Sequence, residues 1–333
     1  MRFRSIFAAF GLVIAVGVAP AHAADKVIFG TNWFAQAEHG GFYQALADGT
    51  YAKYGLDVTI APGGPKAGNR QLLAAGKIDL YMGSTTGALA ALAQGVPTLT
   101  IAAMFQKDPQ VLIAHPEAGF KTLADLAKAS KYLIAKDGMF TYFAWVRAKY
   151  PAFTEDKVEP YTFSAAPFLA DKTAIQQGYV TSEPYAIEKE GGFKPDVFLL
   201  ADDGYESYAT TIEVMKPWYE AHKDVAKRFV EASIIGWYNY LYGDNAAANA
   251  LIVKDNPDMD PARIDAGVEA MKAYGLLTSG DAEEGGIGCL NPARWQRFYE
   301  SLSAIGVVPA GLDAGAALDA SLVCQGLGRE LQK

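Results

Sequence analysis

The sequence predicts an α/β protein with two lobes. Short β-branched or aromatic runs alternate with helical patterns through roughly the first two thirds of the chain, which is typical of parallel strand pairing. The alternation occurs in two successive units, and no Pro/Ser-rich linker separates them. The last third is mostly helical. We therefore expect two mostly parallel sheets, each flanked by helices, and a helical C-terminal region.

The N-terminus has the pattern of a cleaved secretory signal. Arg2 and Arg4 precede an apolar stretch at residues 6–18, and Ala21-His22-Ala23 has the small residues of a cleavage site. The apolar stretch is too short to span a bilayer comfortably, which disfavours the alternative of an uncleaved anchor. Residues 1–23 are therefore assigned to a signal peptide, and the mature protein is expected outside the cytoplasm.

The first unit consists of apolar runs separated by helical patterns that end at glycine. One helical pattern ends at Gly49, a good C-cap, and the next two end at Gly76 and Gly95. The predicted strands are residues 27–30, 56–61, 78–82 and 98–105, and the predicted helices are 42–49, 69–75 and 88–94.

The second unit repeats this arrangement. Thr122 is a good N-cap for one helix, and Pro184 suits the first turn of another. The predicted strands are residues 111–114, 132–135, 158–163, 179–182 and 197–200, and the predicted helices are 123–128, 140–149, 172–177 and 184–191. Four further helices are predicted at residues 218–242, 246–254, 261–274 and 292–305.

The chain is expected to cross between the lobes twice, near Ala114 and near Tyr205. Lobe 1 is then residues 24–113 with 206–333, and lobe 2 is residues 114–205. Ligands of open α/β sheets bind beyond the carboxyl ends of the strands. Two lobes with those ends face to face would form a cleft for a small molecule.

The composition and charge of the chain limit the classes of binding partner. The formal net charge is −8, and it falls to −10 once Arg2 and Arg4 of the predicted signal are removed. The charges are interspersed, without the basic patch that nucleic acid or anionic lipid would require. We therefore expect no nucleic acid and no membrane surface as a partner. The mature chain of about 310 residues is long enough for two domains.

The chain has two cysteines, Cys289 and Cys324. A small, even number of cysteines in an exported protein favours a disulfide. It would close a loop of about 36 residues and stabilise the fold by roughly 3–4 kcal/mol in the chain-entropy model. Two buried free thiols are the alternative.

Several segments together resemble the NMT1/THI5-like family across nearly the whole mature chain. They are Asn32-Trp33, residues 39–43, 51–58, 73–79, Gly95-Val96-Pro97, residues 178–184, Arg294-Trp295 and residues 306–308. The resemblance implies a two-lobed periplasmic-binding-protein fold of type II. It also implies a periplasmic solute-binding component of an ABC importer, whose partners are a permease and its ATPase at the inner membrane.

The resemblance leaves more than one ligand and activity open. Members bind thiamin-pyrimidine precursors, and relatives bind sulfonates, taurine or nitrate. A minority are cytoplasmic enzymes of pyrimidine synthesis with a cysteine-rich, iron-associated motif. This chain lacks that motif and carries an export signal, so we expect a binding protein and no enzyme. A periplasmic partner of a signalling protein is a third possibility.

The candidate ligand contacts mostly follow predicted strands. Trp33 is suited to stacking on a planar ring, and Asn32 offers both a donor and an acceptor; a core tryptophan and a turn asparagine are the alternatives. The resemblance implies that a glutamate near Glu183 accepts hydrogen bonds from a ring amino group, whereas helix capping is its other explanation. The remaining candidates are His39, Gly83, Ser84, Thr85, Asp137, Phe140, Tyr142, Phe163 and Tyr185.

The same residues suggest the kind of ligand. The arginines of the mature chain lie mostly on predicted helix bodies, whereas Glu183 and several aromatics follow strands. This favours a neutral or amino-bearing ring, and the hypothesis is a heterocycle of the thiamin-precursor type. The histidines are scattered without metal-ligand spacing, so we expect no metal and no cofactor. We also expect the protein to act as a monomer.

Overall fold

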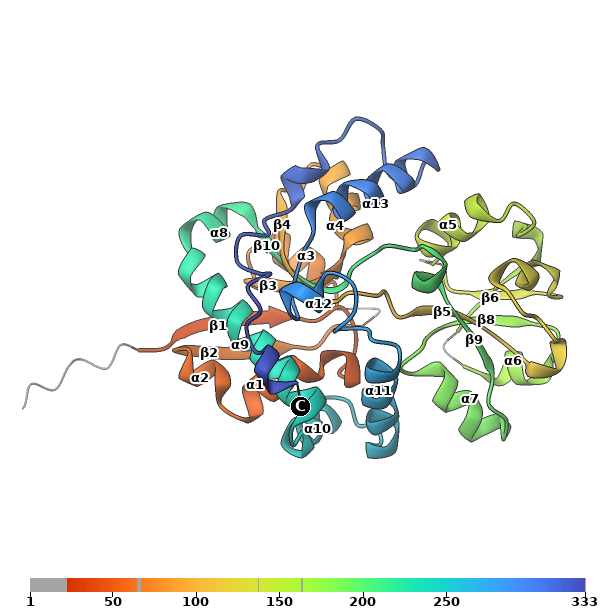
Figure 1. Ribbon diagram of the computed structural model, residues 1–333, viewed down its shortest axis with the longest axis horizontal. Helices are drawn as coiled ribbons and strands as arrows, with labels where there is room; N and C mark the ends of the chain where they lie inside the picture. The colour runs from red at the N-terminus through yellow and green to blue at the C-terminus, as the bar shows by residue number, and fades with distance from the viewer. Residues whose placement is uncertain (1–22, 65–66, 137, 163, 333) are drawn as a thin grey trace, which may run out of the picture.

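The computed structural model describes residues 23–64, 67–136, 138–162 and 164–332 (Figure 1). The predicted signal peptide, apart from Ala23, lies outside these residues, as do the candidates Asp137 and Phe163. The described residues form two five-stranded sheets in separate lobes, which confirms the α/β, two-lobed architecture.

The sheet of lobe 1 has the order β2-β1-β3-β10-β4, and that of lobe 2 has the order β7-β6-β8-β5-β9. The strands of lobe 1 are β1 (Asp25–Gly30), β2 (Leu56–Ala61), β3 (Leu80–Ser84), β4 (Thr98–Phe105) and β10 (Ala209–Met215). The strands of lobe 2 are β5 (Gln110–Ala114), β6 (Tyr132–Ile134), β7 (Val158–Pro160), β8 (Ile175–Tyr179) and β9 (Asp196–Leu199).

One strand of each sheet runs against the other four. β10 is antiparallel to β3 and β4, and β5 is antiparallel to β8 and β9. The other pairings are parallel: β1 pairs with both β2 and β3, and β6 pairs with both β7 and β8. As predicted, most strands of each sheet run in the same direction. The sheets are nevertheless mixed, because the reversed strand of each sheet arrives from the opposite lobe.

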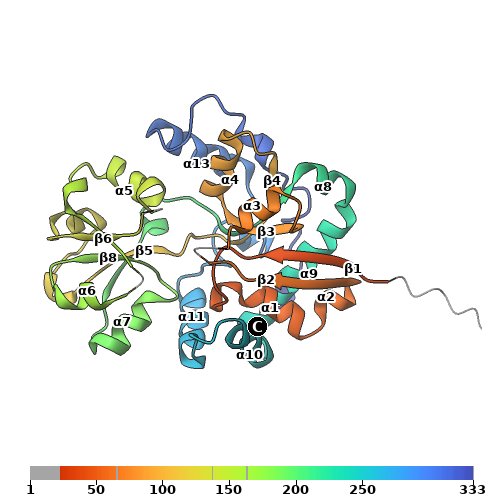
Figure 2. The ribbon, with the colours of Figure 1, turned by 180° about the vertical axis from the view of Figure 1, so that it is seen from behind.

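Helices cover both sheets (Figures 1 and 2). The helices of the first part of the chain are α1 (Gly40–Ala47), α2 (Thr50–Lys53), α3 (Asn69–Ala74), α4 (Thr85–Ala93), α5 (Tyr142–Lys149), α6 (Ala166–Ala170) and α7 (Glu183–Gly191). Those that follow β10 are α8 (Lys216–Ala221), α9 (Lys223–Tyr242), α10 (Ala246–Asp255), α11 (Pro261–Ala273), α12 (Ala282–Gly285) and α13 (Pro292–Ala304). The helical C-terminal region is thereby confirmed, and α11 packs against α7 of lobe 2.

Short 3₁₀ helices complete the chain. They are η1 (Ala37–His39), η2 (Pro116–Ala118), η3 (Leu123–Lys128), η4 (Gly138–Phe140), η5 (Glu155–Lys157), η6 (Leu200–Asp203), η7 (Ala314–Ala317) and η8 (Arg329–Leu331). Thr122 caps η3 through its side chain, as the sequence predicts, although the helix is 3₁₀ rather than α.

Aromatic rings build the core of lobe 1 between the sheet and α9. The Phe29 ring lies 4.4 Å from that of Phe42 and 5.1 Å from that of Phe229, measured between centroids. Gly41 of α1 lets α9 come close, because a Cβ there would lie 2.1 Å from the Trp237 ring. This packing holds η1, which precedes α1 directly, at the carboxyl edge of the sheet.

Several sequence predictions about secondary structure are wrong, among them the single helix at residues 218–242, which is divided into α8 and α9. Residues 172–177 were expected to be helical, but β8 begins at Ile175 and pairs with β5 and β6. The segment at 179–182, expected to be a strand, is mostly the turn after β8. β10 was not predicted at all. The two strands that were missed, β8 and β10, carry the buried polar side chains Gln176 and Glu213, which conceal the apolar pattern of a buried strand.

The pairing also locates the two crossings between sheets. β4 ends at Phe105 and β5 begins at Gln110, so the first crossing is residues 106–109, earlier than the expected position near Ala114. The second crossing is residues 200–208, between β9 and β10, and it includes Tyr205. The division of the rest of the chain into lobe 1 (residues 24–113 with 206–333) and lobe 2 (residues 114–205) stays a prediction.

Cys289 and Cys324 form the predicted disulfide, with an S–S distance of 2.07 Å. The bond joins the segment before α13 to the C-terminal residues that follow it. Among the described residues, no helix has the length and apolar character needed to cross a bilayer.

An ion pair with a buried carboxylate joins α3 to the lobe 1 sheet. Glu213 of β10 has no exposed side-chain area, and Arg70 of α3 donates to both of its carboxylate oxygens, at 2.7 and 2.8 Å. Gly83 of β3 leaves the necessary space, because a Cβ there would lie 1.7 Å from Glu213 Oε1. In this structure the candidate Gly83 therefore accommodates an internal carboxylate.

We expect Arg70→Met to destabilise the protein by about 3–5 kcal/mol, because it leaves the Glu213 carboxylate buried without its partner. The double variant Arg70→Met/Glu213→Leu should lose less, since no unpaired charge remains. Urea unfolding at pH 7 measures both. A double variant as unstable as the single one would contradict this account of the pair.

Candidate ligand-binding site between the lobes

The carboxyl edges of the two sheets face one another, because both crossings leave and enter the sheets at these edges. Five residues at this junction form what we call the interlobe cluster. They are Glu38 of η1, Thr181, Ser182 and Glu183 after β8, and Arg263 of α11. Three distant parts of the chain thus bring polar side chains together where the α/β architecture predicts a ligand.

Glu38 links the lobes directly. Its side chain is only 3% exposed, and its carboxylate accepts a hydrogen bond from the Thr181 hydroxyl of lobe 2. Burial raises the pKa of Glu38, while the Thr181 hydrogen bond and the nearby Arg263 charge partly oppose that shift. A charged Glu38 therefore depends on partners supplied by both sides of the junction.

Arg263 supplies a second link and positive charge in this cluster. Its Nη2 donates to Ser182 Oγ at 2.7 Å, and its charge favours the ionised forms of Glu38 and Glu183. The Nε atom is buried and has no hydrogen-bond partner among the described residues. One guanidinium thus faces two carboxylates and retains an unused donor.

Glu183 begins α7, and its carboxylate accepts a hydrogen bond from the backbone N–H of Tyr179 at 2.6 Å. Burial raises the pKa of Glu183, and the nearby Glu38 carboxylate raises it further. The side chain is half-buried. This contact is made to the end of β8 and not to an N–H of the helix, so only the place of Glu183 in the first turn of α7 agrees with the capping alternative. The position also agrees with the expected place of a ligand contact at the end of a strand.

Asn32 and His39 also come together. His39 Nδ1 accepts the backbone N–H of Gln36 at 3.1 Å, so the ring proton belongs on Nε2, which lies 3.4 Å from Asn32 Oδ1. Burial lowers the pKa of His39 to about 3. The imidazole is therefore neutral at physiological pH and contributes no positive charge to the junction.

The other lobe 1 candidates make internal contacts. Ser84 caps α4 by accepting the Gly87 N–H at 3.2 Å, and Thr85 Oγ1 accepts the Tyr208 N–H at 3.1 Å. Trp33 is half-buried, with its ring 5.6 Å from that of Phe34. These contacts place all three beside the carboxyl ends of β1 and β3.

The lobe 2 candidates are more dispersed. The Tyr142 hydroxyl donates to Gln177 Oε1 at 2.7 Å, which ties α5 to β8. Phe140 is 71% exposed, and Tyr185 is half-buried with Lys189 Nζ 5.6 Å from its ring centroid. Phe140 and Tyr142 therefore belong to the α5 side of lobe 2, whereas Tyr185 belongs to α7 with Glu183.

The crossings add buried groups that the sequence analysis did not select. Asp108 accepts the backbone N–H of Gln110 at 3.0 Å, and burial raises the pKa of Asp108 to about 6. On the second crossing, the Tyr205 hydroxyl lies 3.1 Å from Thr86 Oγ1. Asp108 lies between the strands predicted at residues 98–105 and 111–114, and this position could have identified it as a candidate from the sequence.

Two surface hollows occur elsewhere on the molecule. One of about 470 Å³ lies beside the disulfide and Asn291, and one of about 280 Å³ lies beside Leu99 and Tyr219. The candidate ligand residues line neither. Since Glu38 and Thr181 are in direct contact, a ligand can enter between them only when the lobes move apart.

Comparison with known proteins agrees with this architecture. Residues 36–247 match the family model described as NMT1/THI5 like. The chain belongs to the NMT1/THI5-like family. Its fold is that of the periplasmic binding proteins of ABC transporters, which confirms the expectation from the sequence.

Individual relatives are distant. The chain is 21% identical to the riboflavin-binding protein RibY of Chloroflexus aurantiacus, over 87% of this chain and 83% of RibY. The aliphatic sulphonate binding protein SsuA of Escherichia coli has a TM-score of 0.63 and 15% identity, covering 88% of this chain and 91% of SsuA.

The alkanesulfonate-binding SsuA of Xanthomonas axonopodis pv. citri, solved with MOPS, has a TM-score of 0.64 and 14% identity, covering 90% of this chain and 100% of SsuA. A desulfurization enzyme also shares the fold. Identities this low establish the fold alone.

We expect Thr181→Val to favour separation of the lobes, because it removes the hydroxyl that donates to Glu38 and keeps the side-chain shape. A hydrogen bond to a charged group contributes about 1.5–3 kcal/mol, so the radius of gyration from small-angle X-ray scattering should increase. Lys189→Ala is the matched control, since the Lys189–Asp260 ion pair also joins α7 to the start of α11 but is exposed. An unchanged radius in Thr181→Val would contradict the proposed role of this bond.

We expect stability to fall with rising pH through Asp108. Its pKa of about 6 lies above the ordinary value of 3.8, so the folded protein binds the proton more tightly than the unfolded chain does. The contribution is complete below pH 3.8 and is lost as pH rises through 6.

We compare the free energies of unfolding of Asp108→Asn and the wild type in urea. Relative to the wild type, the free energy of unfolding of the variant should increase by on the order of 3 kcal/mol between pH 4 and pH 7. His39 is present in both proteins, so its opposite pH dependence cancels. Asp202→Asn, at an exposed position on the second crossing, should show no such gain. A pH-independent difference for Asp108→Asn would refute the assignment.

Proposed function

We propose that this protein is the periplasmic substrate-binding component of an ABC importer. Its ligand is an amino-bearing heterocycle of the thiamin-precursor type, held between the lobes and released unaltered to the permease. Family membership and the fold support the importer class. The proposal for the ligand rests on the charge and hydrogen-bonding character of the interlobe cluster.

The observation that carries the ligand proposal is the excess of carboxylates at the junction. The Glu38 carboxylate lies close enough to Glu183 to raise the pKa of Glu183, and Arg263 is a cation near both. A sulfonate or nitrate placed here would face two carboxylates. A ring bearing an amino group instead donates hydrogen bonds to them, and such charge-assisted bonds are roughly twice as strong as neutral ones.

Lobe 1 offers complementary groups for a planar ring. We propose that Trp33 stacks on the ring and that Asn32, oriented by the neutral His39, bonds to its edge. The riboflavin-binding relative is named for a heterocyclic ligand, which agrees with a site for an uncharged, nitrogen-rich ring. On lobe 2, Glu183 and Tyr185 are the proposed contacts.

Sulfonate, taurine or nitrate binding is the second candidate. It is favoured by the solved sulfonate-binding neighbours and by the unused Nε donor of Arg263. For such a ligand the cluster would need a proton on Glu38 or Glu183, whose raised pKa values make protonation easier. An enzymatic role is the third candidate, and conversion of a bound ligand would reveal it.

Isothermal titration calorimetry distinguishes the candidates. The purified protein is titrated with formylaminopyrimidine, hydroxymethylpyrimidine, thiamin, riboflavin, taurine and nitrate. We expect binding of a ring compound and recovery of the same compound after denaturation. Tight binding of taurine or nitrate alone would overturn the ligand proposal, and recovery of a new compound would overturn the non-enzymatic role.

We expect Glu183→Gln to weaken binding of the amino-bearing ring by about 10- to 100-fold, because one charge-assisted hydrogen bond becomes neutral. Glu188→Gln, on an exposed face of the same helix, is the matched control and should bind as the wild type does. Calorimetry with the tightest ligand of the panel measures both. Equal affinities of the two variants would exclude Glu183 as a ligand contact.

A further inference from the structure

One arginine contacts both crossings at once. Arg294, in α13, donates from Nη2 to the Gln106 carbonyl at 2.5 Å and from Nε to the Glu206 carbonyl at 3.1 Å. Its side chain is only 13% exposed. Because Gln106 opens the first crossing and Glu206 lies on the second, this guanidinium joins the two connections between the lobes.

Two further groups, the Tyr208 ring and the Asp281 carboxylate, fix the orientation of the guanidinium. Its plane lies over the Tyr208 ring, 4.0 Å from the centroid, and its Nη1 lies 3.2 Å from Asp281 Oδ2. The Tyr208 hydroxyl donates to the same Asp281 oxygen at 2.6 Å and accepts the Asn291 N–H at 3.0 Å. The fork of donors therefore has a defined direction, which a flexible cation would lack.

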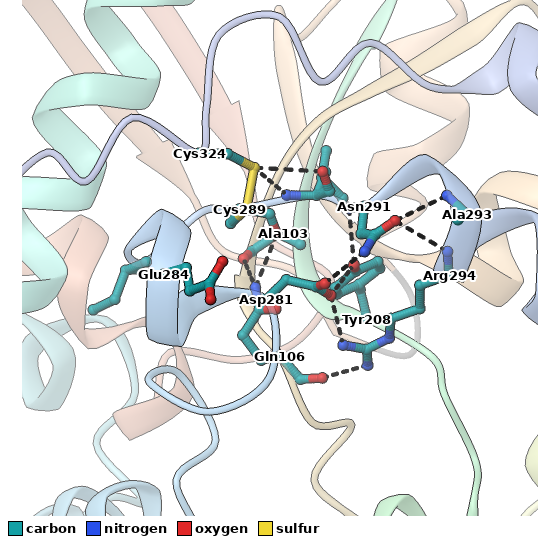
Figure 3. The surroundings of a disulfide bond; sticks show 12 residues. Ala103, Gln106, Tyr208, Asp281, Glu284, Cys289, Asn291, Ala293, Arg294 and Cys324 are labelled. Atoms are coloured by element: carbon teal, nitrogen blue, oxygen red, sulfur yellow. Dashed lines mark hydrogen bonds and ion pairs between the residues drawn. A yellow bond between two sulfur atoms is a disulfide. The ribbon is translucent and has the colours of Figure 1, made fainter.

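The segment that carries these residues is itself attached to lobe 1. Gln106 Nε2 donates to the Cys289 carbonyl at 2.9 Å, and the Ala103 N–H of β4 donates to the Gly288 carbonyl at 3.0 Å. The Cys289–Cys324 disulfide then joins this segment to the C-terminal residues. Residues 281–294 thus lie across the start of the first crossing and the end of the second, as Figure 3 shows.

We propose that residues 281–294, which the disulfide joins to the C-terminal residues, form a hinge strap that holds Gln106 and Tyr208 to lobe 1. Arg294 is its positioning residue. Lobe 2 then turns about the parts of the crossings beyond the strap, residues 107–109 and 200–205. Gly204, with φ of 96°, supplies within the second part a backbone conformation that other residues adopt only with strain.

This proposal concerns the motion of the lobes and does not depend on which ligand binds. The strap makes the two crossings move together, because loosening either one requires breaking bonds to the same guanidinium. It also explains why the C-terminal segment, which contributes nothing to either sheet order, packs at the hinge. The matched pair for a test lies on one helix: Arg294 is buried, whereas Arg297 is exposed and reaches the Glu206 carboxylate at 3.6 Å.

Hydrogen–deuterium exchange of the ligand-free, full-length mature protein, read by mass spectrometry, tests the strap. In Arg294→Ala, exchange at residues 103–110 and 204–210 should accelerate together by about tenfold or more, because both crossings lose a buried donor. Arg297→Ala should stay within about twofold of the wild type at both segments, since exposed ion pairs contribute little.

Two further variants keep the proposal testable if Arg294→Ala does not fold. Arg294→Lys retains the charge but cannot reach both carbonyls with one rigid fork, so both segments should still accelerate. Cys289→Ser/Cys324→Ser should accelerate exchange at residues 281–291 and at both crossings. Wild-type exchange at the crossings in these variants, acceleration of one crossing alone, or an equal acceleration throughout β1 and β3 would overturn the strap.

Discussion

The arrangement of the molecule depends on two reversed strands. β5 and β10 each leave one lobe and enter the sheet of the other antiparallel to its neighbours, at the edge where the parallel strands end. The first crossing allows a span of no more than about 18 Å from Phe105 to Gln110. The carboxyl edges of the two sheets must therefore face each other at short range, and the loops after β1, β3 and β8 meet there without any dedicated linker.

This constraint places polar groups where burial makes them costly. Burial raises the pKa values of Glu38, Glu183 and Asp108. The Glu38 carboxylate accepts its hydrogen bond from Thr181 of the other lobe, whereas Glu183 and Asp108 accept backbone N–H groups close to them in the sequence. Glu38 therefore keeps its donor only while the lobes stay together, unless a ligand replaces the lost partner. In the proposed function, the balance between interlobe bonds and ligand bonds is the physical basis of closure, and the proposed strap limits how the lobes can turn.

The sequence predicts those features that are decided locally or by compartment. Glycines at helix ends and capping residues indicated the positions of most helices and strands. The export signal together with the two cysteines predicted the disulfide. β10 could not be foreseen, because the burial of Glu213 depends on Arg70 from a helix far away in the sequence. Near the junction, Asn32, His39 and Glu183 follow predicted strands, and their role as ligand contacts stays a prediction. Glu38 and Arg263 were missed because only the packing of α11 against η1 and α7 brings them there.

The central claim is that one ligand contacts both lobes at the facing edges of the sheets. Hydrogen–deuterium exchange with and without the tightest compound of the calorimetry panel tests it most directly. The account predicts that saturation with this compound slows exchange at residues 31–39 of lobe 1 and at residues 180–183 of lobe 2 together. Protection confined to one of these segments, or appearing only at the surface hollow beside the disulfide, would contradict it.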